Sequence, residues 1–281
     1  FVRGWPRSYK TGEIIAQRLD MQSIPRDQAM EYEFDHRHPP KLRVKQGESF
    51  VVNTEDAASG YIRSTDVAPH INDFPVRKFE PPKSNPIGGP VYIEGAAKGD
   101  LLEVTIERIV VDDQGFTNFR PGVGPLSDSH RWQPLRGPFV HIIKHLPGPS
   151  GTTWDGKGVF NDKITWDLQP FIGTIGVAPE REVETSAVGQ GPWGGNLDVR
   201  DMKEGTKCYL NCYHDGALLY VGDVHGSQGD TEFYGTADET RAAKALASAE
   251  DTVARTQDTL DKALSDLDDL RAPADEIDLS L

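Results

Sequence analysis

The chain has 281 residues, a net charge of −14, 28 glycines and 20 prolines. That length allows one large domain or two small ones with a sizeable core. The negative charge argues against a nucleic acid or an anionic membrane as partner, and no apolar run approaches the roughly 18 residues of a membrane span.

Short runs rich in valine, isoleucine and tyrosine, set between glycines and prolines, favour a mainly β chain. Residues 41–45 alternate in polarity, residues 46–48 form a turn, and residues 49–54 continue as a second strand, which predicts a hairpin. Asp56 at the end of this strand is a candidate site carboxylate, and a turn cap is the alternative. Residues 58–86 are expected to form a long loop, either a wall or lid over a site or a plain surface loop.

Residues 85–106 show the pattern strand, glycine turns, strand, which predicts a second hairpin. The turns at residues 47–48 and 99–100 each precede an alternating strand, which raises the hypothesis of an internal duplication of one β unit. Residues 156–166 suggest another hairpin. The whole pattern predicts a β-sandwich or barrel-like domain built from hairpins, possibly a duplicated one.

Chemistry-bearing residues gather in residues 222–232, directly after the apolar run 216–221 that predicts a buried strand. Asp223 and His225 are two apart, so they point to the same side of an extended segment. Carboxylate oxygen and imidazole nitrogen are ordinary zinc ligands, and Glu232 is then a third ligand or a general base. A polar turn without any metal is the alternative.

Two separated segments together carry a family resemblance. Residues 194–239 show GGN-x-D, G-x-x-x-Y and GAL-x-x-x-GD-x-H-x-x-QGD-x-E-x-x-GTA-x-E, and residues 85–100 show N-P-x-x-GP-x-x-x-EGA-x-x-GD. The chain therefore resembles the acetamidase/formamidase family over roughly residues 30–239. The resemblance implies hydrolysis of a small aliphatic amide, formamide or acetamide, to ammonia and the carboxylate.

No Ser-Lys amidase signature is visible, and the cysteines lie in a strand-like run without a nucleophile turn, so we expect a metal-activated water. Residue chemistry and the resemblance together suggest a site of eight residues: metal ligands Asp198, Asp223 and His225; catalytic carboxylates Glu232 and Asp56; and substrate-binding residues Asn196, Gln228 and Gly195. Zinc is the expected metal and calcium the alternative. The alternatives for function are hydrolysis of a cyclic or larger amide, and a non-catalytic oligomeric binding protein on the same fold.

Residues 240–281 differ in composition from residues 1–239, which we expect to form the β domain. Leu246, Val253, Leu260 and Leu267 recur every seven residues, which predicts an amphipathic helix. This helix either pairs with another copy, giving the homo-oligomer that we expect, or packs on its own domain.

Cys208 and Cys212 lie four residues apart, which in a strand places their Cα atoms roughly 13 Å apart and too far for a disulfide. We interpret them as packed free thiols in a reducing compartment, and therefore expect a cytoplasmic protein.

Overall fold

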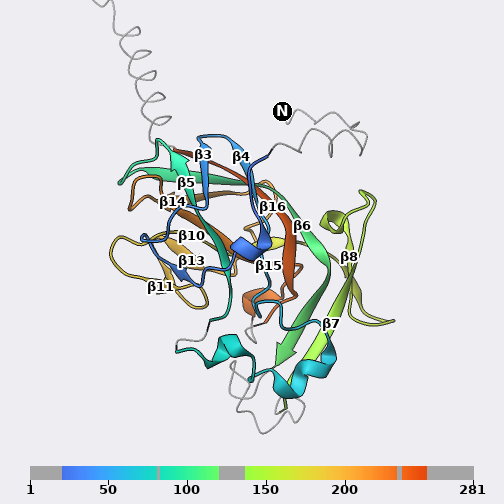
Figure 1. The fold of residues 1–281 in the computed structure, drawn as a ribbon. Coiled ribbons are helices and arrows are strands. Elements are labelled where there is room, and N and C mark those ends of the chain that lie inside the picture. The colour runs from blue at the N-terminus through green and yellow to red at the C-terminus, as the bar shows by residue number, and fades with distance from the viewer. Residues whose placement is uncertain (1–20, 81–82, 120–136, 233–235, 252–281) are drawn as a thin grey trace, which may run out of the picture.

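The computed structural model of the chain describes residues 21–80, 83–119, 137–232 and 236–251 (Figure 1). The strands are β1 (Ser23–Ile24), β2 (Glu33–Phe34), β3 (Leu42–Lys45), β4 (Ser49–Val52), β5 (Ile87–Glu94), β6 (Leu101–Phe119), β7 (Phe139–Leu146), β8 (Lys157–Val159), β9 (Thr165–Asp167), β10 (Phe171–Val177), β11 (Glu184–Thr185), β12 (Gln190–Gly191), β13 (Gly194–Asn196), β14 (Lys207–Asn211), β15 (Leu219–His225) and β16 (Glu239–Asp251). The short 3-10 helices are η1 (Arg26–Gln28), η2 (Thr65–His70), η3 (Pro75–Lys78), η5 (Thr153–Asp155) and η6 (Asp230–Glu232). The prediction of a mainly β chain is confirmed. No helix among these residues is long and apolar enough to cross a membrane.

Most strands belong to one branched sheet that falls into two groups. The first group joins β3, β5, β15, β10, β13 and β12, and the second joins β4, β16, β6 and β14 with the meander β7-β8-β9. The groups meet where β15 changes partner: residues 219–222 pair with β5, whereas Val224 and His225 pair with β16. In the described strands the order has open ends at β12 and β9, so the sheet does not close into a barrel.

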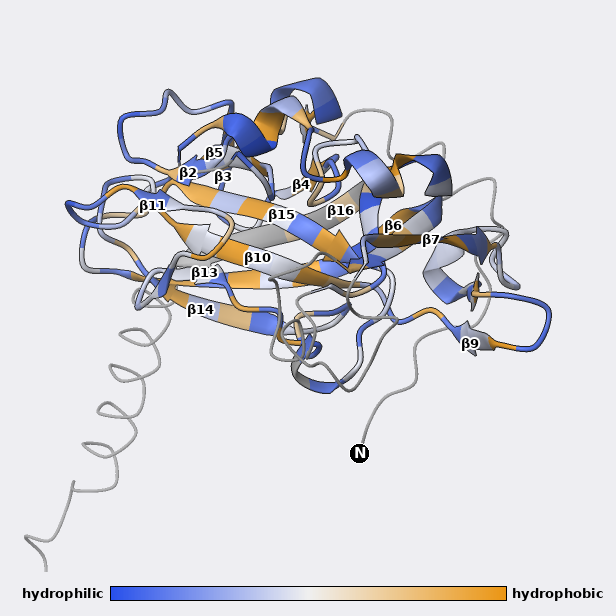
Figure 2. Cartoon of the chain, turned by 90° about the horizontal axis from the view of Figure 1, so that it is seen from below, coloured by the Kyte–Doolittle hydropathy of each residue, from blue (hydrophilic) through white to orange (hydrophobic). Residues whose placement is uncertain are grey.

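Strands of both groups contribute to one apolar core. Val91 of β5, Leu219 and Val221 of β15, and Val104 and Ile106 of β6 belong to one cluster, and each is at most 1% exposed. Burying such side chains stabilises the fold by about 1.5–3 kcal/mol each. Strand β15 is buried along its whole length and lies between β5 and β10, with β13 beyond β10 (Figure 2). It is therefore a rigid support for the polar residues at its end.

The hairpin predicted at residues 156–166 is confirmed, because β8 and β9 pair antiparallel. The strands of the other two predicted hairpins form where expected, but their predicted pairing is wrong. Strand β3 pairs with β5 in parallel while β4 pairs with β1 and β16; likewise β5 pairs with β15 and β3 while β6 pairs with β16, β7 and β14. Each turn thus carries the chain from one strand group to the other, because the apolar faces of both strands pack into the shared core. The chain passes from the first strand group to the second both between β3 and β4 and between β5 and β6. That these two units arose by duplication stays a prediction.

The helix predicted from residue 240 is wrong for residues 240–251, which form most of β16. This segment lies between β4 and β6 and pairs with both, so it satisfies the backbone donors and acceptors of two neighbours. That gain outweighs the helix propensity of its alanines, and the small side chains of Ala242, Ala245 and Ala247 are buried. The boundary predicted at residue 239 therefore coincides with a strand start, and the remaining heptads, from residue 252, lie outside the described residues. Homo-oligomerisation stays a prediction.

Neither cysteine forms a disulfide and both are buried, as predicted. Burial raises the pKa of the Cys208 thiol to about 11, so this group is not a thiolate at neutral pH. The expectation that neither cysteine serves as a nucleophile agrees with this environment.

Candidate active site

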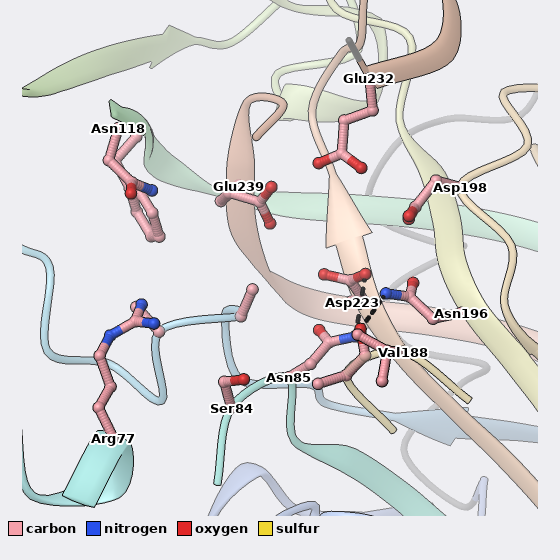
Figure 3. A pocket seen from close by; sticks show the side chains of 14 residues that line it. Arg77, Ser84, Asn85, Asn118, Val188, Asn196, Asp198, Asp223, Glu232 and Glu239 are labelled. Atoms are coloured by element: carbon pink, nitrogen blue, oxygen red, sulfur yellow. Dashed lines mark hydrogen bonds between the residues drawn. The ribbon is translucent and has the colours of Figure 1, made fainter. Parts of the chain in front are cut away.

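A cavity of about 330 Å³ lies beside the C-terminal end of β15 (Figure 3). Its polar lining consists of the carboxyl groups of Asp198, Asp223, Glu232 and Glu239, the amides of Asn85, Asn118 and Asn196, the hydroxyl of Ser84 and the guanidinium of Arg77. These residues come from segments far apart in the sequence. Residues of the 58–86 segment are among them, so of the alternatives left open for this segment the structure favours a wall of the cavity over a plain surface loop.

Asp223 sits at the fork of the sheet. Its neighbour Gly222 pairs with β5 and its neighbour Val224 pairs with β16, so Asp223 lies where the two partners separate and leave room for a cavity. Its backbone is left-handed, with φ 54°. The predicted proximity to His225 is confirmed, because Oδ1 of Asp223 lies 3.3 Å from Nε2 of His225.

Left-handed backbone recurs around this cavity. Asn85, Asp198, Asp223 and Glu232 all have φ between 44° and 62°, although none is glycine, and all four line the cavity. Such a conformation costs on the order of 1–3 kcal/mol per residue and persists where the surrounding structure enforces it, which is typical of functional sites.

Hydrogen bonds fix one face of the Asp223 carboxylate. Its Oδ2 accepts from Nδ2 of Asn85 at 3.2 Å and lies 3.3 Å from the Thr174 hydroxyl. The Thr174 oxygen also accepts from Asn85 and is within 2.9 Å of Oδ1 of Asn196, and Asn196 donates to the carbonyl of Ala187. Because Asn196 is held by protein groups on both sides, its role in this structure is to support the Asp223 network while lining the cavity.

Gln228 fixes the imidazole of His225. Its Oε1 accepts from Nδ1 of His225 at 2.9 Å, and its Nε2 donates to the carbonyl of Asp198 at 2.9 Å. The other ring nitrogen, Nε2, lies 3.3 Å from both Asp223 Oδ1 and Glu239 Oε2. Burial lowers the pKa of His225, but the charges of Glu239 and Asp223 outweigh burial and raise that pKa well above its ordinary value.

The carboxyl groups perturb one another strongly. Burial, followed by the charges of Glu239 and Asp198, raises the pKa of Glu232 to about 10. Burial and the charge of Asp223 raise the pKa of Asp198 to about 7. Burial also acts to raise the pKa of Asp223, yet His225 and its hydrogen bonds lower it overall. Several acids confined in one buried space carry a repulsion that a bound cation would relieve.

Four buried polar atoms in this cluster have no hydrogen-bond partner: Asp198 Oδ1, Asp223 Oδ1, His225 Nε2 and Glu239 Oε2. Ligand atoms of Asp198, Asp223 and His225 lie within 4.8 Å of one another, and so do those of His225, Glu232 and Glu239. Buried polar groups without partners are rare in folded proteins, and oxygen and imidazole donors suit a divalent metal. The residues therefore fit such an ion.

The fold brings Asp198, Asp223, His225, Glu232 and Asn196 together, as the sequence predicted. Gln228 lies behind His225 and supports it. The positions of the other two predicted site residues, Asp56 and Gly195, do not support their assigned roles.

Asp56 is buried away from the carboxyl cluster. Its Oδ1 accepts from the amides of Ala58 and Gly60, and its Oδ2 faces Arg241 at 3.6 Å, so it caps the turn that carries Ala57 and Ala58 into the cavity wall. Gly195 lies within β13, where an added Cβ would come within 2.1 Å of the Gly189 carbonyl. It serves the close approach of β12 and β13, and we no longer assign either residue to the reaction.

Sequence reasoning missed four residues of the site: Glu239, Asn85, Thr174 and Arg77. Glu239 and Asn85 stood in the family motifs but had no role assigned. Glu239 is held in place by the amide of Ala237, which donates to its Oε1 at 3.0 Å. Its neighbour Asp238 is bonded to the buried His145 at 3.0 Å, which anchors the start of β16.

A model of the Acetamidase/Formamidase family matches the chain over residues 18–190 and 186–249, which include every described segment that lines the cavity. The chain is similar to a formamidase of Methylophilus methylotrophus, with 25% identity over 271 residues that cover 76% of this chain and 62% of the relative. It is also similar to an acetamidase of Mycolicibacterium smegmatis, with 25% identity over 250 residues that cover 69% and 59%. The chain thus spans about three fifths of the length of these relatives.

Solved structures show the same relationship. An acetamidase from Bacillus halodurans superposes with a TM-score of 0.71 and 31% identity, over 82% of this chain and 70% of that one. A predicted acetamidase/formamidase from Thermoanaerobacter tengcongensis superposes with a TM-score of 0.68 and 30% identity, over 82% of this chain and 69% of that one. A γ-lactamase from Delftia acidovorans shares the fold. It superposes with a TM-score of 0.66 and 21% identity, over 79% of this chain and 64% of that one.

Proposed function

Because the chain belongs to the Acetamidase/Formamidase family, we propose that it hydrolyses the C–N bond of a small amide to ammonia and a carboxylate. The observation that carries this proposal is the convergence of buried metal-ligating groups, the carboxyl groups of Asp198, Asp223 and Glu239 and the imidazole of His225, beside a cavity that can admit a small molecule. A retired binding domain would have no need to keep several mutually repelling carboxyl groups buried together.

The same donors would hold a divalent cation. Asp198, Asp223 and His225 are the proposed ligands, with zinc as the first candidate and calcium as the second, and Glu239 faces the same space. Such an ion would polarise the amide carbonyl, lower the pKa of water in the cavity and offset the repulsion that raises the pKa of Glu232.

The chain's own residues supply position and proton transfer. Asn85 and Thr174 hold Asp223, and Gln228 holds His225, so the donors are fixed before a substrate arrives. Glu232 takes a proton from the attacking water as the C–O bond forms, and gives it to the nitrogen as the C–N bond breaks. The carboxylic acid so formed gives its remaining proton to the released ammonia, so water and amide become carboxylate and ammonium.

Product analysis tests this function. The metal-supplemented chain is incubated with formamide, acetamide and a γ-lactam, and ammonia and the carboxylate are measured together. We expect equal amounts of both products from at least one linear amide. Opening of the lactam alone would favour the cyclic-amide alternative, and no reaction with any member of the panel would contradict the proposal.

Gly173 gives a further prediction. Because it has no side chain, the carboxylates of Asp198 and Asp223 can occupy the space beside its Cα. A Cβ at this position would lie 2.6 Å from Asp198 Oδ1 and 2.8 Å from Asp223 Oδ2, so Gly173→Ala displaces both groups. A displacement of about 1 Å lowers turnover on the order of 100-fold. Gly229→Ala is the control, since an added Cβ meets no described atom within 4 Å there. Full turnover by folded Gly173→Ala would show that these two carboxylates are not placed as we describe.

A further inference from the structure

The two sides of the cavity differ in charge. The carboxyl groups of Asp198, Asp223 and Glu232 gather on one side, and the guanidinium of Arg77 points into the cavity from the other, below Asn118 (Figure 3). Arg77 is the one basic residue among the described residues that line the cavity. A ligand that spans the cavity therefore meets acidic groups at one end and a fixed cation at the other.

Arg77 belongs to a short helix that is anchored at its start. This helix is η3, and its N-cap residue Phe74 is buried in a second apolar cluster with Ile62, Ile71 and Phe116. The amide of Arg77 also donates to the carbonyl of Phe74 at 2.9 Å. The guanidinium is thus presented by a packed part of the 58–86 segment, and Phe116 of the same apolar cluster also lines the cavity.

The cavity is larger than acetamide needs. At roughly 30 Å³ of liquid volume for each water-sized group, the four non-hydrogen atoms of acetamide fill on the order of 120 Å³. The cavity holds about 330 Å³. Eight such atoms fill about 240 Å³ on the same basis, so a longer amide fits.

From this arrangement we infer that the preferred substrate is an amide whose far end carries a carboxylate, namely the monoamide of a short dicarboxylic acid such as succinamate. This inference rests on the proposed function. The amide group lies among the carboxyl cluster, and the carboxylate pairs with Arg77, whose planar fork suits that group. Water and succinamate give succinate and ammonium, with one C–O bond formed and one C–N bond broken.

The apolar part of the lining suits the methylene groups of such a substrate. Ala58, Phe116 and Val188 line the cavity, and each offers apolar surface. A neutral short amide uses neither this surface nor Arg77, so it forgoes much of the available binding energy.

Succinamate and the uncharged succinamide have the same shape, so their comparison isolates the carboxylate. We expect kcat/KM of the metal-supplemented wild type to be about 10- to 100-fold higher for succinamate, the effect of a charged hydrogen-bonded pair. Arg77→Gln is expected to bring the ratio to about 1. Lys78→Gln removes the same charge from the next residue, which is exposed and does not line the cavity, and is expected to keep the wild-type ratio.

A wild-type ratio at or below 1, or a ratio that Arg77→Gln leaves in place, would overturn the inference while formamide or acetamide turnover leaves the proposed function standing. If no amide is hydrolysed, the proposed function fails. The inference is then tested separately, by calorimetric measurement of the binding of succinamate and succinamide. Binding of succinamate that is at least about 10-fold tighter than that of succinamide, and that is lost in Arg77→Gln, supports it. Equal binding of the two compounds overturns it.

Discussion

Replacing Glu232 by glutamine is expected to lower kcat for amide hydrolysis by about 100- to 10,000-fold, the usual contribution of a positioned general acid–base group. Glutamine keeps the size of the side chain but neither accepts nor returns the proton that moves from water to the leaving nitrogen. KM should change little, because the amide still enters the same cavity. The position of Glu232 beside Asp198 and Glu239, and its strongly raised pKa, mark it as a group whose proton is sensitive to charge in the site.

Asp230→Asn is the matched control for this variant. Asp230 belongs to the same short helix η6, but its side chain is exposed and pairs with Arg200 at the surface. We expect this control to keep wild-type turnover, because surface pairs contribute little. If Glu232→Gln instead retained full turnover in steady-state assays, the proton-transfer role would pass to another carboxyl group, with Glu239 the nearest candidate to test.

Asp223→Asn is expected to lower kcat/KM by more than about 100-fold, beyond the roughly 10- to 100-fold that residues behind a metal ligand contribute. The change removes the charge of a carboxylate that two neighbours, Asn85 and Thr174, hold at the fork of the sheet. If the new amide keeps its oxygen toward Asn85, its NH2 group replaces the proposed ligand oxygen that lies 3.3 Å from Nε2 of His225. Metal affinity should fall with turnover, because Asp223 belongs to the proposed ligand set.

Asp201→Asn is the control here, since Asp201 is exposed and lies outside the cavity. Thermal unfolding followed by circular dichroism shows whether the Asp223 variant is folded. A folded Asp223→Asn protein with wild-type turnover and wild-type metal affinity would remove Asp223 from the site.

The sequence predicted those parts of the site whose residues lie close together along the chain. Asp223 and His225 share one strand, two residues apart, and an apolar run before them predicted the buried support that β15 provides. Glu232 follows on the same loop, so its nearness to them is again a local property. Asp198 and Asn196 were reached through the family motif rather than through any local pattern.

The missed residues depend on long-range pairing. Asn85 meets Asp223 across 138 residues because β5 pairs with β15, and Glu239 faces His225 because β16 takes over that edge. Arg77 reaches the cavity only because Phe74 packs beside Phe116 of β6. Turn patterns and alternation give no certain partner for a strand, which is also why two of the three predicted hairpins were paired wrongly, whereas β8 and β9 do pair with each other.

The tail shows the limit of periodicity as a signal. Leu246 and the leucines beyond it repeat every seven residues, yet residues 240–251 form a strand, because β4 and β6 both pair with them. Asp56 shows a similar limit, since a carboxylate at a strand end can serve a turn as readily as a reaction. Only the three-dimensional arrangement separates these cases.

Metal analysis of the purified wild-type chain, with ammonia release measured in the same sample before and after chelation, tests the central claim most directly. The donor set of Asp198, Asp223, His225 and Glu239 predicts about one tightly held divalent ion per chain. Chelation should abolish amide hydrolysis, and return of zinc or calcium should restore it. Undiminished hydrolysis by chain stripped of its metal would contradict the account.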